Sequence, residues 1–239
     1  MAGSFSLKDL SEDQIQKAFD KSSSKFKEPG VKFVLVTKAN EDIALRMARE
    51  YFITQEPMSK CVGLKWTGEV EEQWKKDMNS GLSLMLLHDE DDDPIAFLTI
   101  EIIRFDDRCD IEGIQYQAYQ DFVRCLADCD RNADFFGHFQ TKEAFHFISL
   151  GVTPKYRQRG YGTKIIYFAI DMVRNFEIGP VYIKVEGSSN FSKKIFERAC
   201  MEILREKYFE DWEFEGRKPF QNTGIHKSLK IYGLKLSAK

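Results

Sequence analysis

The 239-residue chain has no long apolar run and no excess of positive charge. A membrane-spanning helix needs about 20 consecutive, mostly apolar residues, and no segment of this sequence meets that requirement. Its 35 basic residues stand against 38 acidic ones, a formal net charge of −3, so the sequence predicts no dominant basic surface for a nucleic acid. We therefore expect neither a membrane-spanning nor a nucleic-acid-binding protein.

Signals for export and for metal binding are also missing. Charged residues begin at Lys8, which leaves no apolar signal-peptide core, and Ala2 rather than glycine follows the first methionine. The five cysteines are scattered, and Cys125 and Cys129 have no second pair near them, which argues against a zinc site. We expect a cytoplasmic protein with reduced thiols and no bound metal.

What the chain does have is the composition of a globular protein, with 43% apolar and 31% charged residues and 20 phenylalanines. No internal repeat or low-complexity linker divides it. We expect a polar N-terminal extension over residues 1–28 and one domain over 29–239. Within that domain, residues 105–142 are mixed in character, and we interpret them as an inserted loop region over the site, with one helix over 119–128.

Periodicity predicts helices and strands along the domain. Seven apolar or alternating segments are typical of strands: 31–37, 82–88, 95–103, 145–152, 181–186, 204–210 and 226–236. Helical spacing follows Ser11, covers 41–51 with Asn40 as its cap, covers 70–78, and follows Gly162 and Ser189. This order of helices and strands predicts an α/β protein.

The most informative segment is the turn between the strand that ends at Val152 and the helix that begins near Gly162. Apolar residues recur in that helix at i, i+3, i+4 and i+7, from Ile166 to Val173. A helix N-terminus has unpaired N–H groups, and Gly160 and Gly162 have no Cβ to obstruct a phosphate. The segment therefore predicts a diphosphate held by main-chain amides.

Two common diphosphate motifs do not fit this turn. Ile165 stands where the dinucleotide-binding pattern needs a third glycine, and no Gly-Lys-Ser/Thr follows for a P-loop. The pattern that fits is Arg157-x-x-Gly160-x-Gly162 preceded by Val-x-Pro, and it resembles the acetyl-CoA motif of the GNAT superfamily of N-acetyltransferases. The alternative is a glycine turn without a ligand.

This resemblance implies a fold, a co-substrate and the contacts of that co-substrate. The fold is a central mixed, mostly antiparallel twisted sheet of about seven strands flanked by helices, and the co-substrate is acetyl-CoA. The strand backbone would pair with the pantetheine arm, the amides of the turn would hold the pyrophosphate, and two arginines would add positive charge. The residues so implied are Leu150, Gly151, Val152, Arg157, Gln158, Arg159, Gly160, Tyr161, Gly162 and Thr163.

Acetyl transfer to an amine needs a base for the ammonium proton, a donor for the oxyanion and an acid for the thiolate. Many acetyltransferases use a tyrosine of the last helix as the acid, but Phe196 stands at the matching position here. Ser192, on the same predicted helix face, is the candidate from spacing, and a small residue for close packing is the alternative. Ser188 or Ser189 would cap that helix.

A narrower resemblance is carried by the Gln-Glu-Pro-Met segment at 55–58 and the Ser-Ser-Asn-Phe-Ser run at 188–192. Both are similar to segments of the insect-type arylalkylamine N-acetyltransferases, the dopamine acetyltransferase group. The resemblance implies Glu56 as a general base acting through water, with Ser188 and Ser192 assisting. Without it, a structural cap would be the default role of Glu56. Gln55 stands where that group often has an aspartate and Asn190 replaces a histidine, so a hydrophobic primary amine is implied rather than dopamine itself.

His146 matches the first position of a His-x-His pair that relays protons in the vertebrate pineal enzymes, but Ile148 fills the second position. We interpret His146 as a strand residue, with a place in a proton path as the alternative, and Glu186 as a further candidate base.

The sequence as a whole predicts an acetyl-CoA-dependent N-acetyltransferase. Its expected partner is a small-molecule, arylalkylamine-like primary amine, acetylated by direct transfer in a ternary complex. The alternatives are polyamine or protein amino-group acceptors, or a module that binds acyl-CoA without turnover.

Overall fold

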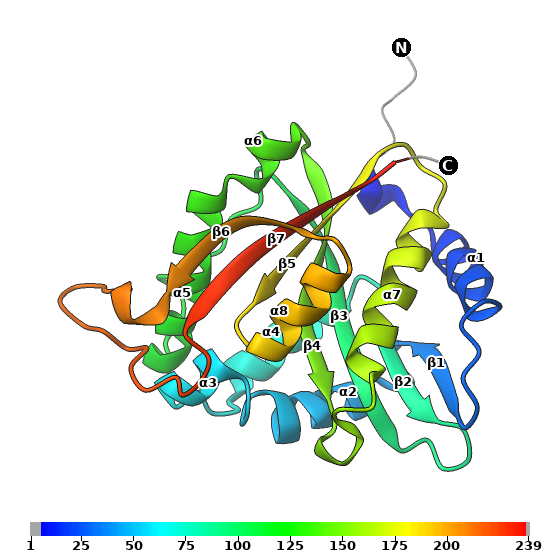
Figure 1. Cartoon of the computed structure of the whole chain (residues 1–239), viewed down its shortest axis with the longest axis horizontal. Coiled ribbons are helices and arrows are strands. Elements are labelled where there is room, and N and C mark those ends of the chain that lie inside the picture. The colour runs from blue at the N-terminus through cyan, green and yellow to red at the C-terminus, as the bar shows by residue number, and fades with distance from the viewer. Residues whose placement is uncertain (1–5, 238–239) are drawn as a thin grey trace.

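The computed structural model describes residues 6–237, in which one seven-stranded sheet runs through the molecule (Figure 1). The strand order is β1-β2-β3-β4-β5-β7-β6, and β4 with β5 is the one parallel pair among these strands. The predicted mixed, mostly antiparallel sheet of seven strands is confirmed. The strands are β1 (Val31–Leu35), β2 (Leu84–His88), β3 (Pro94–Arg104), β4 (Glu143–Val152), β5 (Val181–Gly187), β6 (Glu202–Tyr208) and β7 (Ser228–Leu236).

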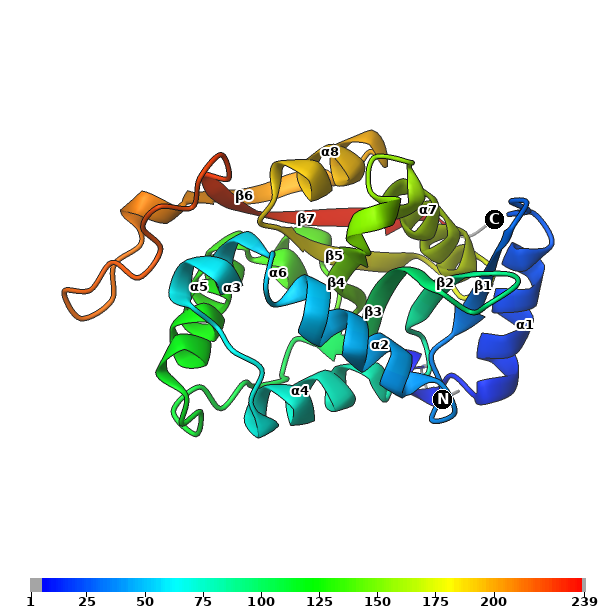
Figure 2. The same cartoon turned by 90° about the horizontal axis from the view of Figure 1, so that it is seen from below.

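Helices cover both faces of the sheet (Figure 2). On one face lie α1, α7 and α8, and on the other lie α2, α3, α4 and α5. A π-helical turn, Ala48–Phe52, continues α2. The helices are α1 (Glu12–Ser23), α2 (Glu41–Met47), α3 (Pro57–Val62), α4 (Gly68–Met78), α5 (Gln117–Ala133), α6 (Phe135–Phe139), α7 (Tyr161–Arg174) and α8 (Asn190–Arg198).

Side chains alternate between the two faces of the central strands. Phe145 and Phe147 of β4 are fully buried in the core that contains α7, whereas His146 between them points to the opposite face. On β5, Lys184 likewise faces α5, where it contacts Asp130. The face under α4 and α5 therefore carries charged side chains in the middle of the sheet.

Two local expectations differ from the structure. The helix expected over 119–128 spans Gln117–Ala133 and is followed by α6, so residues 105–142 are more regular than the sequence suggested. Asn40 does not cap α2: its side chain accepts the Thr37 N–H at 2.8 Å and donates to the Leu35 carbonyl at 2.9 Å instead. This hydrogen bonding closes the turn that leads into the helix, so the cap prediction for Asn40 is wrong.

No helix within residues 6–237 is long and apolar enough to cross a membrane. The expectations that rest on Met1 to Ser4 concern residues outside this described range.

Candidate active site

The sheet opens between β4 and β5. The two strands pair only where Phe145 to Phe147 lie beside Ile183 to Val185, although β4 continues to Val152. Beyond Phe147, no strand within residues 6–237 pairs with the β4 edge that faces β5, while the other edge of β4 stays paired with β3 as far as Val152. Free main-chain N–H and C=O groups on a strand edge pair readily with an extended ligand. Leu150 and Val152, predicted to hold the pantetheine arm, lie on this open segment.

A β-bulge marks the point where the strands separate. Thr99 of β3 pairs with Ser149 and the next residue, Ile100, pairs with Phe147, which leaves Ile148 without an opposite residue. A bulge bends its strand and increases the local twist. The separation of β4 from β5 therefore begins at this extra residue.

The turn after β4 has the geometry expected of an anion site. Gln158 and Gly160 adopt left-handed conformations with φ of 61° and 83°, and no side chain caps the first turn of α7. A Cβ on Gly162 would lie 3.1 Å from Ile195 of α8 and 3.5 Å from Val152. Glycine at this position therefore lets α7 approach both neighbours, and the free N–H groups of α7 point out at the end of the open strand.

Arg157 braces this turn. Its Nε donates to the Val152 carbonyl at 3.0 Å, and its Nη1 donates to the side-chain oxygen of Gln55. The sequence suggested that Arg157 adds charge for the pyrophosphate, and that role stays a prediction. The structure shows a second role, because the arginine ties the turn to the residue directly before Glu56.

Glu56 caps α3. Its carboxylate accepts the N–H groups of Met58 at 3.0 Å and Ser59 at 2.5 Å, and Pro57 occupies the first helical position. The capping role considered from the sequence is therefore present. Because the side chain remains partly exposed, it is also open to water, as the predicted base requires.

The serines meet at the start of α8. Ser189 is the N-cap, since its Oγ accepts the Ser192 N–H at 3.0 Å. The Ser192 hydroxyl donates back to the Ser189 carbonyl at 3.0 Å, and Ser188 lies just beyond the end of β5. The buried positions of this helix are Lys193 and Phe196, so Ser192 lies beside the buried face and remains partly exposed.

A sequence comparison identifies the family. The profile described as "Acetyltransferase (GNAT) family" matches residues 45–201, about two thirds of the chain. The chain belongs to the GNAT acetyltransferases. As a member it is an N-acetyltransferase with acetyl-CoA as co-substrate, and the open edge of β4 and the uncapped start of α7 fit that co-substrate. A search of curated protein sequences finds no match.

Solved structures share the fold of this acetyltransferase. Arylalkylamine N-acetyltransferase 2 from Aedes aegypti has a TM-score of 0.79 at 18% identity, covering 85% of this chain and 98% of that one. Mosquito arylalkylamine N-acetyltransferase like 5b has a TM-score of 0.79 at 19% identity, covering 86% and 100%. A Drosophila melanogaster polyamine N-acetyltransferase has a TM-score of 0.73 at 15% identity, covering 86% and 100%.

His226 joins the site of this acetyltransferase from the chain just before β7. Its Nδ1 accepts the Asn190 N–H at 3.0 Å, which places the ring proton on Nε2 when the ring is neutral. Burial and the Lys193 ammonium lower the pKa of His226, and the Glu56 carboxylate opposes them. The ring is therefore a neutral N–H donor near Glu56. The sequence analysis placed His226 only on a predicted strand, because nothing in its spacing connects it with α8.

His146 is bound between two carboxylates. Its Nδ1 is 3.0 Å from Glu101 and its Nε2 is 2.7 Å from Glu186. Burial would lower the pKa of His146, but the two carboxylates outweigh burial and raise it to about 9. Glu186 also contacts the Lys184 ammonium at 2.7 Å; burial opposes ionisation, but these two cations hold its pKa far below the usual range. At neutral pH His146 is charged and Glu186 is ionised, so neither is a ready proton acceptor.

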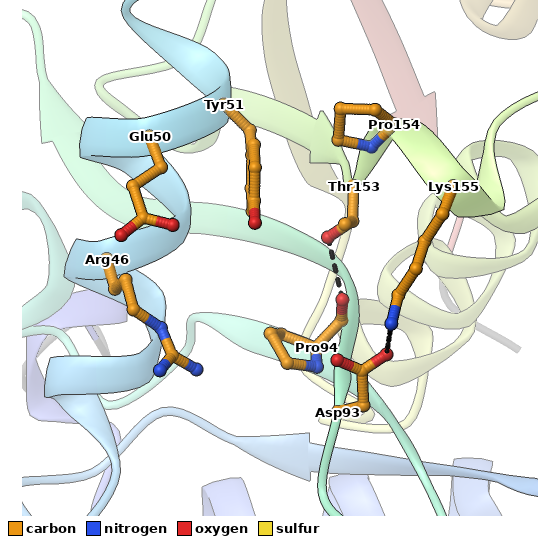
Figure 3. A pocket seen from close by; sticks show the side chains of 8 residues that line it. All are labelled: Arg46, Glu50, Tyr51, Asp93, Pro94, Thr153, Pro154 and Lys155. Carbon is orange, nitrogen blue, oxygen red and sulfur yellow. Dashed lines mark hydrogen bonds and ion pairs between the residues drawn. The ribbon is translucent and has the colours of Figure 1, made fainter.

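A hollow of about 450 Å³ lies between the turn that follows β4 and the helical segment that contains Arg46, Glu50 and Tyr51 (Figure 3). The Thr153 hydroxyl donates to the Pro94 carbonyl at 2.6 Å, and Lys155 forms an ion pair with Asp93 at 2.6 Å. Since these polar groups satisfy each other, we assign the hollow no part in the chemistry. It is lined by Arg46, Glu50, Tyr51, Asp93, Pro94, Thr153, Pro154 and Lys155.

Proposed function

We propose that this GNAT enzyme acetylates the primary amine of a small molecule by direct transfer in a ternary complex. The observation that carries the proposal is the continuity of the site. The free edge of β4 leads into the uncapped N-terminus of α7, and Arg157 links that turn to the segment containing Glu56.

The residues that would hold acetyl-CoA follow from this geometry. Main-chain groups of Leu150 and Val152 pair with the pantetheine arm, and the amides from Gln158 to Thr163 receive the pyrophosphate. Arg159, whose guanidinium lies 5.7 Å from the Tyr156 ring, adds positive charge. Acetyl-CoA supplies an acetyl group activated as a thioester.

The transfer itself needs groups at the end of the open strand. Glu56, whose side chain is partly exposed to solvent, accepts the ammonium proton through water. The Nε2–H of His226 and the hydroxyls of Ser188 and Ser192 donate hydrogen bonds to the charge that develops on oxygen and sulfur. Phe196, fully buried against Tyr232, has no donor to offer.

Two acceptor classes are candidates. The motif resemblance favours an arylalkylamine, and two of the structural neighbours are arylalkylamine N-acetyltransferases by name. An aliphatic diamine or polyamine is favoured by the carboxylates on the inner sheet face, Glu101 and Glu186 among them, and one neighbour is named a polyamine N-acetyltransferase. A protein amino group is the third possibility that the experiment includes.

The test is thiol release from acetyl-CoA in the presence of tyramine, tryptamine, dopamine, spermidine and a short peptide with a free N-terminus. We expect release with at least one small amine and none with the peptide. If every amine leaves the thioester intact while acetyl-CoA still binds, the chain is a binding module and the proposed function is wrong.

A further inference from the structure

Five ionisable side chains contact one another on the sheet face that α4 and α5 cover, and a sixth, Asp77 of α4, is close enough to Glu101 and His146 to interact with their charges. Glu101, His146 and Glu186 form a row across three neighbouring strands, with hydrogen bonds of 3.0 Å and 2.7 Å, and Lys184 joins Glu186 at 2.7 Å. We call this group the inner cluster. Its members are Asp77 of α4, Glu101 of β3, Asp130 of α5, His146 of β4, and Lys184 and Glu186 of β5.

The inner cluster holds more acidic than basic groups. It contains four carboxyl groups and two cationic groups, so two negative charges are in excess when all six are ionised. Lys184 is shared between Asp130 and Glu186, and His146 between Glu101 and Glu186. Each of the two cations therefore already has two carboxylate partners.

Asp77 is the carboxyl group without a cation. Within residues 6–237 it has no ion pair, and its hydrogen-bond donor is the Gln73 amide at 2.7 Å. Burial and the negative charge of Glu101 disfavour its ionised form and raise its pKa to about 7. An additional cation beside Asp77 and Glu101 would relieve this repulsion.

Two polar atoms next to the cluster lack partners. The hydroxyl of Thr99, a residue only 1% exposed, has no hydrogen-bond partner among the described residues, and neither has the buried Oδ1 of Asp130. Thr99 stands two residues before Glu101 on β3, so its side chain is on the same sheet face. The site therefore offers unused hydrogen-bonding capacity in addition to unbalanced charge.

The inner cluster is partly open to solvent and lies near the opening between β4 and β5, where the acetyl group would be transferred. The side chains of Glu101 and Asp130 remain 35% and 39% exposed, although both belong to the face beneath the helices. Glu186 lies one residue beyond the last β4–β5 pair, where the strands separate. Glu101, two strands away, is about 10 Å from that point. An extended aliphatic chain can bridge this distance.

We propose that Asp77 and Glu101 bind the distal cationic group of a diamine or guanidinoalkylamine acceptor, whose near amino group is acetylated at the opening between β4 and β5. This inference rests on the proposed function. Of the acceptor classes considered there, it favours the aliphatic diamine or polyamine. An ammonium or guanidinium between the two carboxylates would pair with both, and the Thr99 hydroxyl would accept a hydrogen bond from one of its N–H groups.

The experiment compares acceptors that differ only in the second charge. We measure kcat/KM for 1,4-diaminobutane, agmatine and 1-aminobutane in the wild type, Asp77→Asn and Glu101→Gln. The wild type should favour the dications over aminobutane at least about tenfold, and each variant should reduce that ratio at least about tenfold. Glu72→Gln, an exposed acid on the same helix as Asp77, removes the same charge and should keep the wild-type ratio.

Binding separates this inference from the proposed function. Calorimetric titration with 1,4-diaminobutane should show wild-type and Glu72→Gln binding, with Asp77→Asn and Glu101→Gln weakened at least about tenfold, and thermal unfolding checks that each variant is folded. Equal kcat/KM for aminobutane and the dications, or equal losses for all acceptors in the variants, overturns the inference while leaving the enzyme assignment intact. Absence of acetylation of any amine overturns the proposed function, and the titration still decides whether the cluster binds a dication.

Discussion

At the scale of single residues, the Glu56 carboxylate serves two demands that compete for its oxygens. It holds the first turn of α3 through the N–H groups of Met58 and Ser59, and the proposed chemistry needs it to accept a proton through water. A carboxylate oxygen has lone pairs for both. The cap fixes the side chain in place, which is what a base acting through one water requires.

We predict that Glu56→Gln lowers kcat/KM at least about 100-fold at neutral pH, because the amide cannot accept the ammonium proton. The amide oxygen still accepts one N–H of α3, so the free energy of unfolding should fall by only about 1 kcal/mol. Steady-state kinetics and chemical denaturation check both values. Glu90→Gln, at the exposed tip of the β2–β3 hairpin, is the matched control. Full activity of Glu56→Gln would remove the base assignment.

Asp77 gives a second prediction at this scale. Its pKa is raised from an ordinary value of 3.8 to about 7, so the folded protein binds this proton more tightly than the unfolded chain does. The resulting stability is present below pH 4 and is lost as the pH rises toward 7. Asp77→Asn should therefore raise the free energy of unfolding at pH 8 by roughly 2–4 kcal/mol, with no gain at pH 4. Denaturant titrations at the two pH values measure this; a gain of equal size at both would contradict it.

At the scale of elements, the packing of α7 against α8 and β4 depends on Gly162, which has no side chain. A Cβ on Gly162 already lies 3.1 Å from Ile195, and a valine would add two methyl groups in the same gap. We predict that Gly162→Val shifts the start of α7 and weakens acetyl-CoA binding at least about tenfold. Equilibrium binding of acetyl-CoA is the measurement. Gly179→Val, where no atom lies within 4 Å of the added Cβ, should bind normally.

The connection between β6 and β7 is a long arm that projects from one end of the molecule (Figure 1). Arg217 fastens it to α5 through a two-pronged ion pair with Asp121 at 2.9 Å, and Arg124 of α5 lies 4.1 Å from the Phe214 ring. The arm ends near His226, which contacts the start of α8 in the candidate active site. The anchoring of the arm therefore bears on the position of that ring.

Arg217→Ala should lower the free energy of unfolding by about 1–3 kcal/mol, because Asp121 is only 5% exposed and would lose its cation. It should also lower kcat while leaving the affinity for acetyl-CoA unchanged, since the arm carries His226 and not the phosphate-binding turn. Thermal unfolding and steady-state kinetics test this. Lys218→Ala, the exposed neighbour, is the control, and unchanged kcat in Arg217→Ala would show that the arm does not position the site.

At the scale of the whole molecule, the opening between β4 and β5 divides the sheet. Within residues 6–237, no residue of β4 beyond Phe147 is paired with β5, and α7 and α8 contact each other. A ligand that pairs with β4 and with the start of α7 would join the two parts. Acetyl-CoA at about 100 times its Kd should therefore add roughly 2.7 kcal/mol of stability and raise the Tm by about 5–10 °C. Scanning fluorimetry measures the shift, which should persist in Glu56→Gln and fall in Gly162→Val.

Much of the fold followed from the sequence because its signals are local. The apolar run at 145–152 and the helix after Gly162 lie within a few residues of their predicted bounds, and Ser189 is one of the two caps considered for α8. Asn40 failed as a cap because its short polar side chain found equally close backbone partners in the preceding turn. Several backbone groups near such a side chain can serve as its hydrogen-bond partner, and the sequence does not show which of them it will bind.

The sequence by itself predicted the turn proposed for the co-substrate, since Arg157, Gly160 and Gly162 lie within six consecutive residues and form a recognisable local motif. Only the tertiary structure decided which distant groups share the site. His226 meets Asn190 across 36 residues, and Glu101 meets His146 across 45. Only the tertiary structure decided the charges of the two histidines as well, because burial and neighbouring ions shift the pKa values of His146 and His226. The motif implied for acetyl-CoA was thus readable in one contiguous segment, whereas the inner cluster, proposed to select the acceptor, is formed by side chains from five elements of the folded chain.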